Sequence, residues 1–150
     1  MAVVFELVVT FDDEETAAKA VVPDHVQAGS QRFALHRVLN DRELSLIPAG
    51  VSWGLPMDRS RVTLTRSELT ALGHALYELL RTLNGYAAAM VGWDPELFTD
   101  LAELAADWPD APNGLVLSTA ARESLPAAPG FEPFTPGFDW LPYEGERSGN

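Results

Sequence analysis

The chain of 150 residues has no cysteine, three histidines and a single lysine among its ten basic residues. The absence of cysteine excludes disulfides, thiolate metal sites and cysteine nucleophiles. The longest uninterrupted apolar run, Tyr86 to Val91, is far too short to span a membrane. The first residues read Met-Ala-Val-Val-Phe-Glu, with no basic region before the apolar stretch, unlike a secretory signal. We therefore expect a soluble cytoplasmic protein without membrane partners.

Motifs of catalysis and metal binding are missing as well. The sequence has no Gly-x-Ser-x-Gly, no Gly-x-Gly-x-x-Gly and no Walker-type loop. His25, His36 and His74 lack the spacing that would place two ligands on one helical face. The four acids Asp12–Glu15 point in different directions on a helix, which favours a helix start over an ion site. We expect no cofactor, no metal and no catalytic residues; a small acid/base enzyme using the abundant carboxylates is the less favoured alternative.

Negative charge is present in excess and is unevenly distributed. The formal net charge is −12. Residues 1–75 carry ten acids and seven bases, a net charge of −3, whereas residues 76–150 carry twelve acids and three bases, a net charge of −9. Such a field repels nucleic acid and attracts basic partners, although solubility alone also accounts for it.

Hydrophobic periodicity indicates an α+β protein. Alternating residues predict strands at 3–11, 32–39 and 42–47, and a Thr65/Glu68 capping box begins a leucine-striped helix over 66–83. Short strands are expected at 61–64, 86–93 and 115–117. A short helix is expected to begin at the acids Asp12–Glu15, where Asp12 and Glu15 have capping-box spacing, and to continue through Val22; further helices are expected at 94–107 and 119–125. The order over 3–93 matches the β-α-β-β-α-β ferredoxin-like sandwich, followed by a helix–strand–helix extension. We assign residues 1–128 to a single α+β domain.

Residues 129–150 form an extended aromatic and Pro-rich C-terminal arm, which is packed on the domain or projects from it. Five of the fourteen aromatic residues lie between Phe131 and Tyr143, and a Pro-Gly-Phe-acid unit occurs twice. Proline at this density excludes a helix. Packing is the favoured interpretation for the phenylalanines, whereas Trp140 and Tyr143 suit either a core or an interface.

Two stretches carry a resemblance to a known class of proteins. Gly85-Tyr86 through Trp93-Asp94-Pro95-Glu96, and Pro136-Gly137-Phe138-Asp139-Trp140 through Glu146, look like segments of small acidic immunity proteins from bacterial polymorphic toxin systems. The resemblance implies a non-catalytic domain that neutralises a cognate basic toxin by occluding its active or substrate-binding surface. We expect the following residues to contact this protein partner: Trp93, Asp94, Asp139, Trp140, Tyr143, Glu144 and Glu146.

The alternative function is a regulatory or self-associating interaction module. Self-association through the aromatic arm would make the chain a homodimer, whereas the immunity function is compatible with a monomer. The sequence leaves this choice open.

Overall fold

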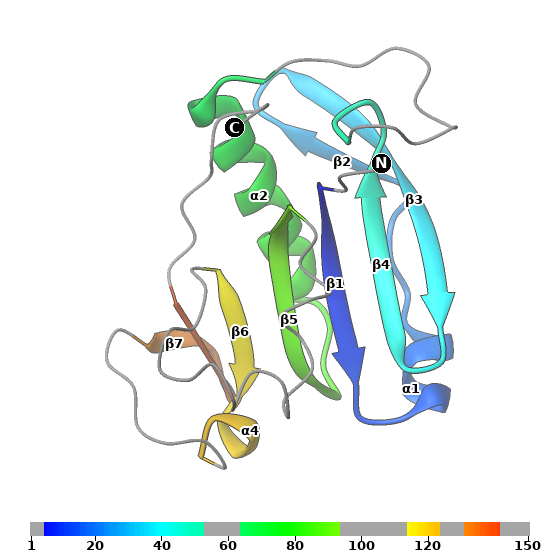
Figure 1. The fold of residues 1–150 in the computed structure, drawn as a ribbon, viewed down its shortest axis with the longest axis vertical. Coiled ribbons are helices and arrows are strands. Elements are labelled where there is room, and N and C mark those ends of the chain that lie inside the picture. The colour runs from blue at the N-terminus through cyan, green and yellow to red at the C-terminus, as the bar shows by residue number, and fades with distance from the viewer. Residues whose placement is uncertain (1–4, 53–63, 94–113, 124–130, 142–150) are drawn as a thin grey trace.

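The computed structural model describes residues 5–52, 64–93, 114–123 and 131–141 (Figure 1). These residues form a mixed α+β fold with one antiparallel sheet, which confirms the α+β part of the prediction. The helices are α1 (Glu14–Lys19), α2 (Arg66–Leu80) and α4 (Thr119–Glu123). The strands are β1 (Phe5–Phe11), β2 (His25–Ala28), β3 (Gln31–Asn40), β4 (Glu43–Pro48), β5 (Tyr86–Trp93), β6 (Leu115–Ser118), β7 (Glu132–Thr135) and β8 (Phe138–Trp140).

The sheet has eight strands in the order β2-β3-β4-β1-β5-β6-β8-β7. It is therefore larger than the four-stranded sheet that a β-α-β-β-α-β order implies. The central strand β1 pairs with β4 through Leu7↔Leu46 and with β5 through Leu7↔Val91. Because all the strand pairs are antiparallel, neighbouring apolar residues meet in rows on each face.

Alternation along β1 decides which residues enter the main core. Phe5, Leu7, Val9 and Phe11 are at most 1% exposed and share one face with the leucines of α2. Figure 1 shows α2 lying against the sheet, with the β2–β3 hairpin near its N-terminal end. Burying one such leucine side chain stabilises the fold by about 1.5–3 kcal/mol before entropy is counted.

The other face of the sheet is apolar too, which a two-layer sandwich would not require. Val8 is fully buried, and Ala88, Met90, Leu115 and Leu117 form a second cluster with Ala121 of α4. β5 and β6 thus contribute apolar side chains to both faces. A strand buried on both sides reads as a continuous apolar run, as Tyr86 to Val91 does.

Helix boundaries follow the local chemistry of their caps. The capping box of α2 is confirmed: the Thr65 amide donates to Glu68 Oε1 at 3.0 Å, and the Glu68 amide donates to Thr65 Oγ1 at 3.1 Å. The cap of α1 is Asp13, whose carboxylate accepts from the Thr16 amide at 2.7 Å. The acidic run Asp12–Glu15 does mark the helix start, but the cap is Asp13 and not Asp12. The predicted end of this helix at Val22 was late, since α1 ends at Lys19.

Other predictions differ from the structure at element ends or lie outside the described residues. α2 ends at Leu80 rather than at residue 83, because the amides of Thr82 and Leu83 form tighter i→i−3 bonds there. β2 was not predicted at all. The predicted helix at 94–107 and the strand residues 61–63 lie outside the part of the chain that the structure describes.

Candidate functional site

The described part of the C-terminal arm is a hairpin that extends the sheet. β8 pairs with β6 through Val116↔Trp140, and β7 pairs with β8. Pro136 and Gly137 form the turn between them, with Gly137 at φ +89°, a conformation that glycine adopts without steric cost. The Leu141 amide donates to the Leu115 carbonyl at 3.0 Å, which fixes the end of β8.

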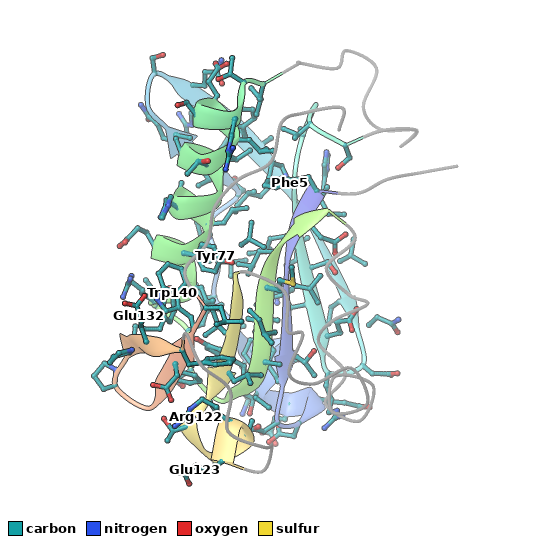
Figure 2. All side chains as sticks on the ribbon, turned by 60° about the vertical axis from the view of Figure 1, so that its left-hand side comes forward. Phe5, Tyr77, Arg122, Glu123, Glu132 and Trp140 are labelled. Carbon is teal, nitrogen blue, oxygen red and sulfur yellow. The ribbon has the colours of Figure 1, made fainter. Side chains whose placement is uncertain are left out.

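Trp140 is held in an aromatic cluster with α2. Its ring centroid lies 5.0 Å from that of Tyr77 and 5.0 Å from that of Phe134. Phe134 is 5% exposed, whereas Trp140 is only partly buried. The packing therefore fixes the indole while leaving part of it accessible to solvent. Figure 2 labels Trp140 close to Tyr77 and Glu132.

Tyr77 connects this cluster to the sheet. Its hydroxyl donates to the Gly114 carbonyl and accepts from the Val91 amide at 3.3 Å. The β5–β6 ladder runs from Ala88↔Leu117 to Met90↔Leu115. The Val91 amide and the Gly114 carbonyl lie just beyond its last pair, and both hydrogen-bond to the Tyr77 hydroxyl. A buried hydroxyl thus stands in for a missing strand-to-strand hydrogen bond.

Arg81, just after α2, fastens the hairpin from the other side. Its Nη1 donates to the Phe134 carbonyl at 2.6 Å, and its guanidinium carbon lies 4.3 Å from the Phe134 ring centroid. The same side chain donates from Nε to Glu78 Oε1 at 3.2 Å. Cation–π stacking and a carbonyl acceptor together hold β7 against the end of α2.

Asp139 lies on the opposite face of the hairpin from Trp140, because successive residues of a strand alternate. Its Oδ2 accepts from Arg122 Nε at 3.1 Å and from Thr119 Oγ1 at 3.4 Å. The Arg122 and Asp139 side chains are 33% and 21% exposed, so the pair ties α4 to β8. Asp139 and Trp140 therefore do not form one continuous patch.

The remaining sequence-predicted site residues are not brought to Trp140 by the described structure. Trp93 ends β5, where its backbone pairs with Phe5. Trp140 is aligned with Ala89 through Val116, so Trp93 lies four residues further along β5, about 13 Å, and two strands across. The other four, Asp94, Tyr143, Glu144 and Glu146, lie outside the described residues.

Glu132 is the acid that the structure does place next to the indole. It is exposed, and its backbone pairs directly with Trp140 in the β7–β8 register. Directly paired residues of an antiparallel pair project to the same face, which here is the face that packs on α2 through Tyr77. The sequence signal was the repeated Pro-Gly-Phe-acid unit, but only the hairpin register reveals which acid faces Trp140.

A second acidic region lies around α1 and the β3–β4 turn, on the other side of the molecule from β7 in Figure 1. The exposed acids Asp12, Asp13, Glu14 and Glu15 precede or begin α1, and the β3–β4 turn adds Asp41 (Figure 1). The Arg42 carbonyl accepts from the Phe11 amide at 2.9 Å, which holds this turn against the end of β1. Hydrogen bonds from Thr16 lower the pKa of the Asp13 carboxyl, as a helix cap requires.

The three histidines lie on β2, β3 and α2. His25 Nδ1 is 2.8 Å from Asp24 Oδ1, and this hydrogen bond lowers the pKa of Asp24. His36 Nε2 is buried without a hydrogen-bond partner among the described residues, and His74 is exposed on α2. Within residues 5–52, 64–93, 114–123 and 131–141, no three histidines or acids are grouped as metal ligands would be.

None of the described helices has the length and apolar content needed to cross a bilayer. The chain matches no family model, and no curated protein or solved structure is significantly similar to it.

Proposed function

We propose that this chain is a non-catalytic protein-binding domain, an immunity protein that neutralises a basic toxin by covering its active or substrate-binding surface. The observation that carries the proposal is the α2-facing side of the β7–β8 hairpin, where partly exposed Trp140 lies beside exposed Glu132. A tryptophan bordered by charged groups is the composition typical of an interface anchor and its polar rim.

The way Trp140 is supported favours recognition. Tyr77 and Phe134 each contact its ring with centroids 5.0 Å apart, so the indole is already ordered before a partner arrives. A side chain that is fixed in advance loses little conformational entropy on binding. Glu132 opposite it supplies a carboxylate to which an arginine or lysine of the partner binds.

The surrounding charge favours a basic partner. Residues 76–150 carry a net charge of −9. The two described cations of this half are already paired, Arg81 with Glu78 at 3.2 Å and Arg122 with Asp139 at 3.1 Å. Exposed Glu123 and Glu132 therefore contribute negative potential that steers a basic protein to this side and weakens with salt.

The pairing of Asp139 with Arg122 changes the role we propose for Asp139. Reversing its charge would break the contact between α4 and β8, so a loss of binding would not distinguish contact from misfolding. We therefore place Glu132 with Trp140 at the centre of the proposed surface. Trp93, Asp94, Tyr143, Glu144 and Glu146 remain proposed partner contacts.

We also infer that β1, α1, β3, β4, α2 and β5 constitute a ferredoxin-like unit within the larger sheet. Their sequential order is β-α-β-β-α-β, and their order in the sheet is β3-β4-β1-β5 with antiparallel neighbours. Ala17 of α1 and the leucines of α2 enter the same core cluster, which supports both helices covering one face. In this description β2 is an insertion, and β6, α4, β7 and β8 are an addition beside β5.

The proposal is tested by capturing the partner and assaying protection. The full-length protein is used as bait in lysate of the source organism at low and at high salt, and retained proteins are identified by mass spectrometry. We expect a basic toxin domain that is retained at low salt and released at high salt. Co-expression of the chain should then restore growth to cells that produce this domain.

A matched pair of variants tests whether the partner binds at the surface that contains Trp140 and Glu132. Glu132→Lys and Glu14→Lys make the same charge change at exposed positions on β7 and α1, which lie on opposite sides of the molecule in Figure 1. We expect protection to be lost with Glu132→Lys and kept with Glu14→Lys. Failure of the wild-type chain to protect against any captured basic protein would overturn the proposed function, and equal protection by both variants would move the surface elsewhere.

A further inference from the structure

The two edges of the sheet differ in how they are closed. β7 is four residues long, contains Pro133 and has its Phe134 carbonyl occupied by Arg81. Short length, proline and an occupied acceptor are the devices by which proteins keep an edge strand from pairing. Among the described residues, the other edge has no such protection along half of its length.

That open half belongs to β3, which has ten residues, whereas β2 pairs only with Gln31–Ala34. The Leu35 amide donates to the Asp24 carbonyl at 2.8 Å, toward the β2 side, and the Ala34 carbonyl accepts from Ala49 at 2.8 Å, away from that side. Since backbone groups alternate along a strand, Arg37 and Leu39 direct their N–H and C=O groups outward. Among the described residues, no backbone group pairs with them.

Apolar side chains are exposed at the same place. Val38 is 47% exposed and Leu39 is 42% exposed, and the two residues project to opposite faces of the sheet. Figure 1 shows this part of β3 on the outer side of the sheet, beyond β4. A strand that paired with this edge could therefore form backbone hydrogen bonds and also cover the exposed apolar side chains of Val38 and Leu39.

We propose that a second copy of this chain occupies this edge, with the two β3 strands antiparallel about a twofold axis at Val38. In this register Arg37 faces the partner's Leu39 as a hydrogen-bonded pair, and Leu39 faces the partner's Arg37. Val38 lies directly opposite its own copy, so two exposed valines cover each other. The sheet becomes continuous through both subunits, and the interface is isologous.

Charge complementarity also favours this register. Arg37 lies diagonally across from the partner's Asp41, within reach of a long side chain, and the twofold axis repeats the pair. Arg37 already donates from Nη1 to the Ala20 carbonyl at 2.8 Å, which holds it at the edge. Shifting the register by two residues toward the N-terminus of β3 would instead place Arg37 opposite its own copy, with like charges facing each other.

The dimer is expected to be weak and to respond to salt in an unusual direction. The pairing uses five residues, 36–40, so the buried area falls below that of a standard interface. Each chain carries a net charge of −12, so the subunits repel each other at long range. Salt screens that repulsion and should strengthen the dimer, whereas it should weaken binding to a basic toxin. The proposed dimer and the proposed binding to a toxin can therefore be confirmed or refuted independently of each other.

A single introduced thiol tests the register directly, because the native chain has no cysteine. In the proposed dimer, residue 38 forms a non-hydrogen-bonded pair with Cα atoms about 4.5 Å apart, a separation that a disulfide spans. Val38→Cys should form a covalent dimer in a glutathione redox buffer, at least about tenfold more than Val21→Cys. Val21 is the matched control, since it is 86% exposed and lies outside the sheet.

Sedimentation equilibrium of the unmodified chain from about 1 µM to about 1 mM, at low and high salt, provides the second readout. We expect concentration-dependent dimerisation that is stronger at high salt. Val38→Lys would place two ammonium groups against each other and should weaken it at least about tenfold, while Val21→Lys should not. A monomer at every concentration, or equal cross-linking of both cysteine variants, would overturn the proposal.

Discussion

Two buried tyrosines should respond in opposite ways to the same substitution. Tyr77 and Tyr86 are each 1% exposed, and both pack against rings of the C-terminal hairpin. The Tyr77 hydroxyl is bonded to the Val91 amide and the Gly114 carbonyl. The Tyr86 hydroxyl is buried with no hydrogen-bond partner among the described residues, and burial raises its pKa.

Tyr77→Phe leaves one backbone donor and one acceptor inside the protein without their partner. An unsatisfied buried group costs about 1–3 kcal/mol, part of which is offset because the phenol no longer has to be desolvated. We expect the free energy of unfolding to fall by about 2 kcal/mol. For a chain of this length the midpoint of thermal unfolding then falls by about 4–8 °C.

Tyr86→Phe removes only a polar atom that is already without a partner. The ring stays stacked on Phe138, at 4.2 Å between centroids, and edge-on to Phe11 at 6.5 Å. We expect the free energy of unfolding to stay the same or to rise by up to about 1 kcal/mol. Urea unfolding followed by circular dichroism measures both variants, with the m-value as a check that the denatured state is unchanged. Similar losses at both positions would refute the reasoning.

Three further predictions concern the turn before β5, the α2 cap and the hairpin. Gly85→Ala should cost about 1 kcal/mol more than Gly137→Ala in thermal unfolding, because both have positive φ but only at Gly85 does a Cβ come within 2.8 Å of Thr16 Cγ2. Hydrogen bonds from the Thr65 cap hold the pKa of Glu68 below its ordinary value of 4.5. The stabilisation is thus complete above that pH and lost as pH falls through the lowered pKa, and Glu68→Gln should flatten this dependence in acid unfolding curves. Arg81→Gln should speed native-state amide exchange in β7 and β8 but not in β1, because only the hairpin loses its clamp.

Elements with a strong local signal could be predicted from the sequence. The β1 alternation and the Thr65/Glu68 box each depend on residues within a few positions of one another, and both are confirmed. The Asn40-Asp41 turn is confirmed as well, with Asp41 at φ +55°. In these places local propensity and tertiary packing favour the same conformation.

The extent of the sheet could not be predicted, because it depends on pairings between distant segments. β2 contains only four residues and forms only by pairing with Gln31–Ala34. The segment Glu132–Trp140 contains prolines that are typical of a loop. It nevertheless forms a hairpin, because β8 pairs with β6 and Arg81 donates a hydrogen bond to the Phe134 carbonyl of β7. For the same reason the sequence grouped Asp139 with Trp140, whereas the register places Glu132 there instead.

The affinity of the captured basic partner for wild-type, Glu132→Lys and Glu14→Lys proteins tests the proposed surface most directly. Calorimetric titration at low salt should show Glu132→Lys binding at least about tenfold more weakly, as expected for losing a contact at an interface centre. Glu14→Lys, with the same change in net charge, should bind within about threefold of wild type at that salt concentration. Equal weakening by the two variants would show that total charge alone attracts the partner, and it would contradict a binding surface centred on Trp140 and Glu132.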